Sequence, residues 1–169
     1  MKTRQLTTMA ILTALALVIH TLEAFIPIPG NIPGVKLGLS NIIIIYALWS
    51  LGPKDAVQIL LIRILLSAVF SGNFMALLYS LGGGTLAILT AIGLKYVLSE
   101  DQIWISGCLS AVAHSVGQTI VAIAISGTWS FLIFLPVLLI ASILTGIFTG
   151  FCGQILVKRG KNLWKTIFK

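Results

Sequence analysis

The feature that most constrains this chain is a long stretch without formal charge. No Asp, Glu, Lys or Arg occurs between Gln102 and Val157. A soluble domain needs a polar coat, and a chain with 58% hydrophobic and only 9% charged residues cannot supply one. The mean hydropathy of +1.09 points the same way. We therefore predict an integral membrane protein with no separate soluble domain between its apolar runs.

Local breaks divide the chain into six apolar segments, and a spanning helix needs roughly 20 apolar residues. Gly52-Pro53 ends the second segment because proline has no N–H to continue the helix. Ser71-Gly72-Asn73 is a turn signal. We expect an all-α fold in one domain, residues 1–157, followed by a basic amphipathic tail, residues 158–169. Its six transmembrane helices are expected at about 5–26, 38–52, 54–71, 74–97, 103–125 and 130–157.

The distribution of basic residues predicts the orientation. Six crossings place both termini on one side, which holds nine Lys and Arg against one on the other side, Lys36. The positive-inside rule then puts both termini in the cytoplasm. The net charge of +7 is thus explained by topology and by contact of the tail with anionic lipid, without nucleic acid. The nine basic residues are Lys2, Arg4, Lys54, Lys95, Lys158, Arg159, Lys161, Lys165 and Lys169.

Two charged residues, Arg63 and Glu23, lie in the predicted spans away from their cytoplasmic ends. Arg63 lies midway along the third helix, where insertion costs roughly 2.5–3.5 kcal/mol, so it should face the protein interior and have a partner. Glu23 lies near the outer end of the first helix. A Glu23–Arg63 pair and direct contact of Arg63 with a ligand are both open, and they are compatible if the pair lines a cavity.

Further polar residues share helix faces with these charges. His20 lies three residues before Glu23, and His114 and Gln118 lie four apart on the fifth helix. Each histidine could simply bond across helices. Together, however, these polar groups are more numerous than helix packing requires. We therefore predict a polar pocket that opens outward. No ligand spacing supports a metal at the two histidines, so neither a metal site nor a cofactor is predicted.

The stretch PIPGNIPGVKLGLSN, residues 27–41, joins the first two helices on the predicted outer side. Its prolines stiffen the chain and its glycines allow tight turns. Lys36 and Asn41 lie at the start of the second helix, where a helix N-terminus and a lysine attract anions. The stretch is interpreted as a wall or lid of the pocket. The alternative is a connector whose lysine extends to the membrane interface.

Small residues indicate close helix contacts. The GGGT run at 82–85 permits either close approach of another helix or a local break that frees backbone groups for a ligand. Gly146 and Gly150 have the spacing of a close helix contact. Ala10 and Ala14 form a similar face on the first helix, which either packs internally or docks another membrane protein.

Four features together resemble one family. They are PIPGNIPGVKLGLSNI at 27–42, Arg63, LGGGTL at 81–86 and AHSVGQT at 113–119. They are similar to the Gx transporter family, which is also labelled heptaprenyl diphosphate synthase component I, over about residues 5–155. Ser115 departs from the pattern, because asparagine is more usual there. The family resembles the substrate-binding S components of energy-coupling factor (ECF) transporters, which implies six helices in a bacterial cell membrane with cytoplasmic termini.

The resemblance also implies a function. S components bind a small solute from outside, here a flavin, a vitamin or an isoprenoid-like molecule. They dock on a transmembrane coupling subunit, here through Ala10 and Ala14, and ATPases complete the complex. The chain has no G-x-x-x-x-G-K-[ST] motif, so it cannot power transport itself. The candidate ligand-binding residues are His20, Glu23, Lys36, Asn41, Arg63, His114 and Gln118.

Two alternatives follow from the same resemblance. One is a membrane subunit or scaffold of flavin- or quinone-linked electron transfer, and the other is a part in prenyl diphosphate or menaquinone metabolism. Condensation of prenyl diphosphates uses magnesium held by clustered carboxylates. The chain has no aspartate-rich motif, so we predict that it is not an enzyme and assign no catalytic residue.

Overall fold

The computed structural model describes residues 3–23, 25 and 38–167, with side chains up to residue 160. Within these residues the regular structure is entirely helical, which confirms the all-α prediction. Two short 3-10 helices, η1 (Glu100–Gln102) and η2 (Trp129–Phe134), precede α5 and α6. The main helices are α1 (Thr3–Glu23), α2 (Ser40–Ser50), α3 (Pro53–Ser71), α4 (Phe74–Lys95), α5 (Ile103–Ser126) and α6 (Leu135–Ile167).

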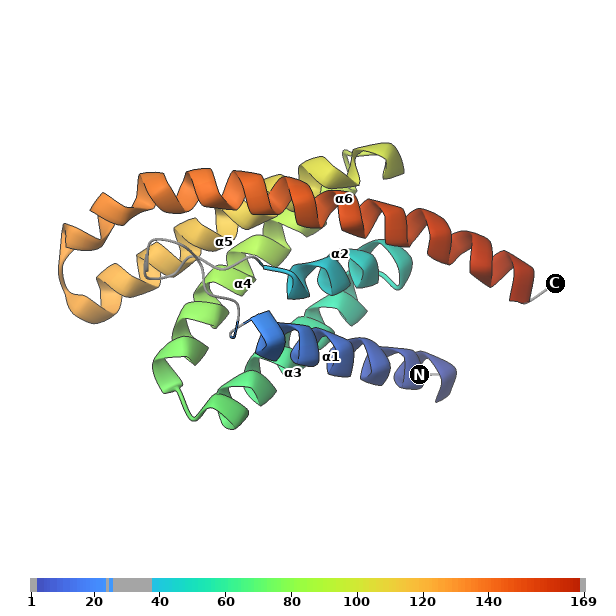
Figure 1. Cartoon of the computed structure of the whole chain (residues 1–169), viewed down its shortest axis with the longest axis horizontal. Helices are drawn as coiled ribbons and strands as arrows, with labels where there is room; N and C mark the ends of the chain where they lie inside the picture. Colours follow the sequence, from blue (N-terminus) through green and yellow to red (C-terminus); the bar gives the residue numbers. More distant parts are fainter. Residues whose placement is uncertain (1–2, 24, 26–37, 168–169) are drawn as a thin grey trace.

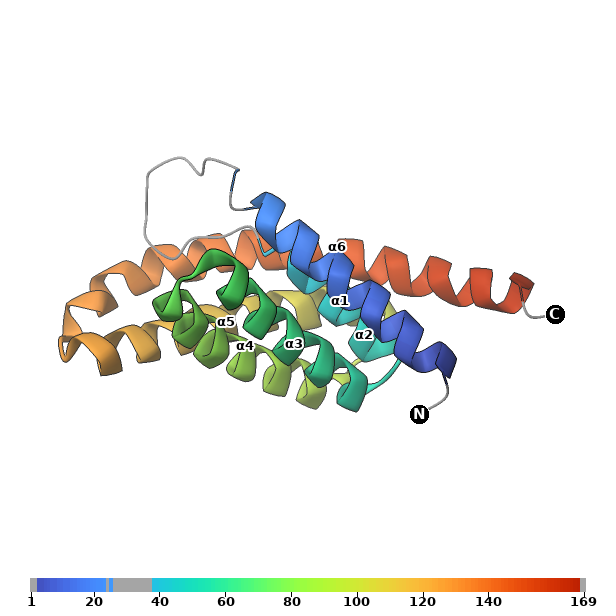
Figure 2. The ribbon, with the colours of Figure 1, turned by 90° about the horizontal axis from the view of Figure 1, so that it is seen from below.

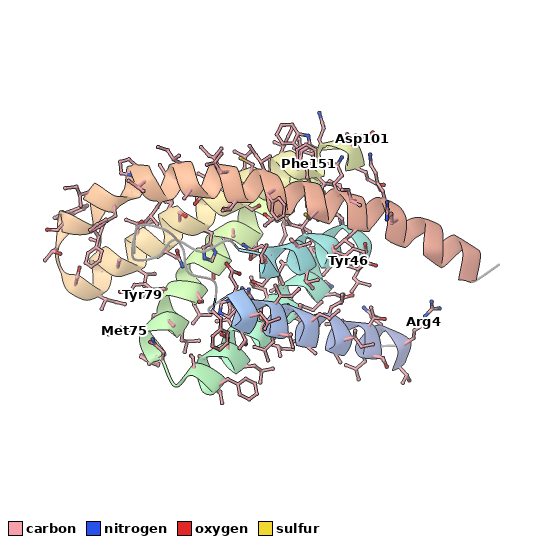
Figure 3. The ribbon with its side chains drawn as sticks, in the orientation of Figure 1. Arg4, Tyr46, Met75, Tyr79, Asp101 and Phe151 are labelled. Atoms are coloured by element: carbon pink, nitrogen blue, oxygen red, sulfur yellow. The ribbon has the colours of Figure 1, made fainter. Side chains whose placement is uncertain are left out.

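Successive helices run in alternating directions. The N-terminal end of α1 and the C-terminal end of α6 therefore lie at the same end of the bundle (Figures 1 and 2). Arg4 marks this end, whereas Met75 and Tyr79 lie toward the opposite one (Figure 3). This arrangement is the one that six crossings require. Which end faces the cytoplasm stays a prediction.

Four helical segments are long and apolar enough to cross a membrane: Thr3–Glu23, Phe74–Lys95, Glu100–Ser126 and Trp129–Gly160. The chain is therefore a multi-pass helical membrane protein. With 11 residues, α2 covers only about half of the hydrocarbon core. α3 carries charges at Lys54, Asp55 and Arg63. Crossing by these two helices, and hence the total of six, stays a prediction.

The surface of the bundle is apolar and part of its interior is polar. Arg63 and Glu23 are buried, with 4% and 5% of their surface exposed. Leu15, Val18 and Leu22 on α1 are exposed. This distribution suits a protein whose solvent is lipid, because an apolar side chain costs nothing there and a charged one must face inward.

Aliphatic side chains hold α1, α2 and α3 together. Leu48 and Ile59 are fully buried in this cluster, and Ala16 lets α1 approach them. The cluster reaches α4 through Ile88 and Ala91. The first three helices therefore pack through side chains.

Glycines hold α4, α5 and α6 together. A Cβ on Gly117 would lie 2.5 Å from the carbonyl oxygen of Gly82, and a Cβ on Gly107 would lie 2.4 Å from the Cα of Gly150. Close approach was one of two interpretations of the GGGT run, and it is confirmed. The other, a local break, is wrong because α4 is unbroken from Phe74 to Lys95.

The ends of α1, α2 and α6 differ most from the prediction. α1 ends at Glu23 rather than near residue 26, and α2 is shorter than the expected 38–52. The expected helix at 130–157 begins with the 3-10 turns of η2 and becomes α-helical at Leu135. Pro136 fits the first turn of α6 because no N–H is required there. α6 then continues beyond Val157 to Ile167.

Candidate functional site

A polar pocket lies between the helices, and each of the six contributes to its lining. About 60 Å³ of it is accessible to water-sized groups. Six of the seven sequence-predicted ligand-binding residues line it: His20, Glu23, Asn41, Arg63, His114 and Gln118. The structure thus brings together residues that are far apart in the sequence.

The remaining predicted residues lie elsewhere. Of the predicted wall or lid at 27–41, residues 27–37, including Lys36, lie outside the described residues. Ala10 and Ala14 are exposed on α1 and do not line the pocket. Internal packing therefore does not account for the two alanines within the described part of the chain.

Glu23 connects the end of α1 to the start of α2. Its carboxylate oxygens accept hydrogen bonds from the backbone N–H of Gly38, at 2.5 Å, and of Leu39, at 3.1 Å. Carboxylates are favourable at a helix N-terminus because unpaired N–H groups and the helix dipole meet there. Gly38 has a φ of +70°, which favours glycine, and a Cβ at this position would also press on Asn41. Glu23 and Gly38 therefore fix how α2 enters the bundle.

Arg63 has a neutral partner. Its Nη1 donates to the hydroxyl of Ser40, while its Nε, although buried, has no hydrogen-bond partner among the described residues. Glu23 is near enough to act on Arg63 electrostatically, but the two side chains form no salt bridge in the described structure. A direct Glu23–Arg63 pair was one of the two interpretations that the sequence left open, and it is not formed. The carboxylate of Glu23 instead accepts one backbone N–H on each oxygen, which orients it toward the start of α2.

The glycine run of α4 makes room for the polar face of α5. A Cβ on Gly83 would lie 2.8 Å from the Cγ of Gln118 and 2.9 Å from the ring of His114. Any larger residue at this position would displace both side chains. Gly83 therefore allows His114 and Gln118 to occupy the pocket wall.

Sequence reasoning missed a wall of hydroxyl groups. The hydroxyl of Ser142 donates to the carbonyl of Leu138 at 2.6 Å, so it accepts the hydrogen bond from Ser115 at 2.5 Å. Thr145 and Thr149 continue this face of α6, and their hydroxyls also bond carbonyls of their own helix. The spacing of 142, 145 and 149 was the available signal. The unpredicted polar lining residues are Ser40, Ser80, Ser115, Ser142, Thr145 and Thr149.

The donor set does not form a metal site. Among the described residues, no group of three or more His, Cys, Asp and Glu side chains is placed to hold a metal ion. What the pocket offers is a guanidinium, two imidazoles, amides and hydroxyls. Such groups can bind a small polar or charged molecule through hydrogen bonds.

Comparison with known proteins gives one match. The model of the family described as heptaprenyl diphosphate synthase component I matches residues 12–156. This range includes every pocket residue from His20 to Thr149. No curated protein and no solved structure matches the chain.

Proposed function

Because this chain belongs to the heptaprenyl diphosphate synthase component I family and encloses a polar pocket between membrane helices, we propose that it is the substrate-binding component of a small-molecule uptake transporter. The observation that carries the proposal is the pocket itself. Six helices with apolar outer faces converge on a buried arginine, a carboxylate and a hydroxyl wall. Such groups are expensive in a bilayer, and a bound solute explains why they are placed together.

The position of the pocket supports capture from outside. Glu23 ends α1 and Ser40 begins α2, so this part of the lining lies away from the end that holds the described termini. With the termini in the cytoplasm, as the basic residues predict, the pocket occupies the outer half of the membrane. A substrate-binding component requires this orientation.

The carboxylates support a binding protein over a synthase. Glu23 is engaged by backbone N–H groups, Asp55 accepts from Gln5 at 2.6 Å, and Asp101 pairs with Lys158. Asp55 and Asp101 do not line the pocket. Magnesium-dependent prenyl transfer needs clustered carboxylates, so we propose that this chain is not itself the catalyst.

A thermal-shift titration tests the proposal. The purified chain is titrated with flavins, vitamins, isoprenoid diphosphates and quinone precursors. We expect one class to raise the melting temperature of the wild type and not of Arg63→Ala. If no compound does so, and only a co-expressed membrane partner stabilises the chain, the protein is a scaffold instead.

A second experiment tests the docking face. Small residues allow close helix approach, and Ala14 is exposed on α1. We expect the tagged chain to co-purify with a co-expressed ECF coupling subunit and its ATPases, and Ala14→Trp to abolish this. Ala124→Trp, on the exposed face of α5, is the matched control and should retain the complex. Equal loss in both variants would contradict docking through α1.

A further inference from the structure

The polar pocket adjoins a second cavity of different chemistry. This second cavity, of about 140 Å³, shares Gln118 and Leu138 with the polar pocket. Tyr79, one of its lining residues, lies toward the end of the bundle opposite to Arg4 (Figure 3). We call it the aromatic chamber, and its other lining residues are Thr119, Ala122, Phe131 and Phe134. A molecule in the polar pocket that passes Gln118 therefore meets an apolar, largely aromatic wall.

The guanidinium of Arg63 has a hydrogen-bond donor in the polar pocket that is not used. Its hydrogen bond through Nη1 goes to the neutral hydroxyl of Ser40, and its buried Nε–H has no partner among the described residues. Glu23 acts on this charge electrostatically without contacting it, but a buried charge also needs its hydrogen-bonding groups to be paired. The Nε edge of a guanidinium presents two parallel N–H groups, a geometry that fits the two oxygens of a carboxylate or phosphate.

The carboxylate of Glu23 does not fill this role. Its two oxygens are held by the N–H groups of Gly38 and Leu39, at the N-terminus of α2. The helix N-terminus compensates part of its negative charge. Glu23 is thus turned to the backbone, and the guanidinium of Arg63 keeps its Nε edge for another acceptor.

From these observations, and resting on the proposed binding role, we infer that the ligand is an amphipathic oxyanion. Its carboxylate or phosphate group binds the Nε edge of Arg63. Its apolar part, a ring system or hydrocarbon chain, occupies the aromatic chamber between Tyr79, Phe131 and Phe134.

Matched probes test the two parts separately. Geranyl monophosphate and 4-phenylbutyrate carry head and tail, geraniol and 4-phenylbutyramide lack the charge, and inorganic phosphate and butyrate lack the tail. Binding to the full-length purified chain is measured by calorimetry, and native mass spectrometry identifies any compound that co-purifies. We expect at least one complete probe to bind roughly tenfold or more tightly than both of its truncated analogues. Which of the two complete probes does so shows whether the acidic group of the ligand is a carboxylate or a phosphate.

Variants assign each preference to its cavity. Arg63→Gln should remove the advantage of the charged probe, and Arg63→Lys should restore only part of it because lysine lacks the paired N–H groups. Ala122→Phe should fill the aromatic chamber and remove the advantage of the tail. Ala124→Phe, exposed on the same helix, should bind like the wild type. Size-exclusion profiles show which variants are folded.

The outcomes separate this inference from the proposed function. A bound or co-purified ligand without an acidic group, or one insensitive to Ala122→Phe, overturns the amphipathic oxyanion but leaves a substrate-binding protein. If no probe binds and no compound co-purifies, the amphipathic oxyanion fails, and the proposed function fails as well only if the thermal-shift titration also finds no ligand. A co-purified carboxylate or phosphate with an apolar part, lost in Arg63→Gln and Ala122→Phe, supports both.

Discussion

The two halves of the molecule are held together by different means. In α1, α2 and α3, large aliphatic side chains such as Leu48 and Ile59 fill the space between helices. In α4, α5 and α6, glycines such as Gly107 and Gly117 bring one backbone against another. The polar pocket lies between the two, with Arg63 on one side and the α6 hydroxyls on the other.

This difference predicts how the stability of each half responds to substitution. A side-chain core loses contacts when a side chain is shortened, and its neighbours can partly collapse into the space. A backbone contact cannot yield when an atom is added, because both helices would have to separate. Since α5 and α6 carry most of the pocket wall, their fixed spacing also fixes the site.

The largest effect is expected for Gly107→Leu. Even a Cβ at this position would lie 2.4 Å from the Cα of Gly150, so α5 and α6 must move apart. The cost should exceed the roughly 3 kcal/mol of ordinary overpacking, and we expect no monodisperse protein in detergent by size-exclusion chromatography. Gly93→Leu is the control, because nothing lies within 4 Å of its Cβ. A well-folded Gly107→Leu would remove the contrast between the halves.

The next effect is expected for Ile59→Ala in the side-chain half. Ile59 is fully buried, so its truncation should lower the unfolding free energy by about 2–5 kcal/mol while leaving the protein folded. Unfolding by SDS in mixed micelles, followed by circular dichroism, measures this difference. Leu61→Ala, on the exposed side of the same helix, should change it little. Equal effects at both positions would show that α3 has no preferred buried face.

Most of the fold and much of the pocket could be predicted from the sequence. Gly52-Pro53 and the turn at 71–73 locate helix ends because they act through local backbone chemistry. Arg63 and His114 stand out because polar groups are rare in membrane helices, and the structure places both at one pocket. Residues whose insertion into lipid is unfavourable therefore indicate an interior site.

The sequence did not predict the hydroxyl groups of α6 or the backbone partners of Glu23, and both omissions have physical reasons. Thr145 and Thr149 bond carbonyls of their own helix, so they cost little in a membrane and do not stand out in the sequence. The sequence offered Arg63 as one possible partner of Glu23, beside contact of Arg63 with a ligand, because side-chain charges are visible in a sequence. The true partners are the backbone N–H groups of Gly38 and Leu39. Their position depends on where α2 begins relative to the end of α1.

Glu23→Ala tests the contact that positions α2 within the side-chain half. The substitution leaves two partly buried backbone N–H groups without a charged acceptor, which should cost about 1.5–3 kcal/mol. The same SDS unfolding experiment measures this loss. Thr21→Ala is the control, because Thr21 is exposed and bonds only the carbonyl of Leu17. A loss as small as that of the control would mean that aliphatic packing alone positions α2.

The smallest effect is expected for Asp101→Asn, which removes the salt bridge between η1 and α6. The bridge is short, at 2.6 Å, but the side chains of Lys158 and Asp101 are 48% and 81% exposed. Water and salt screen such a pair, so its loss should cost less than about 1 kcal/mol and vanish in high salt. Unfolding curves of both proteins at low and high salt measure this. A large, salt-independent loss would show that α5 and α6 depend on this surface pair as well as on their glycines, and the contrast between the halves would have to be redrawn.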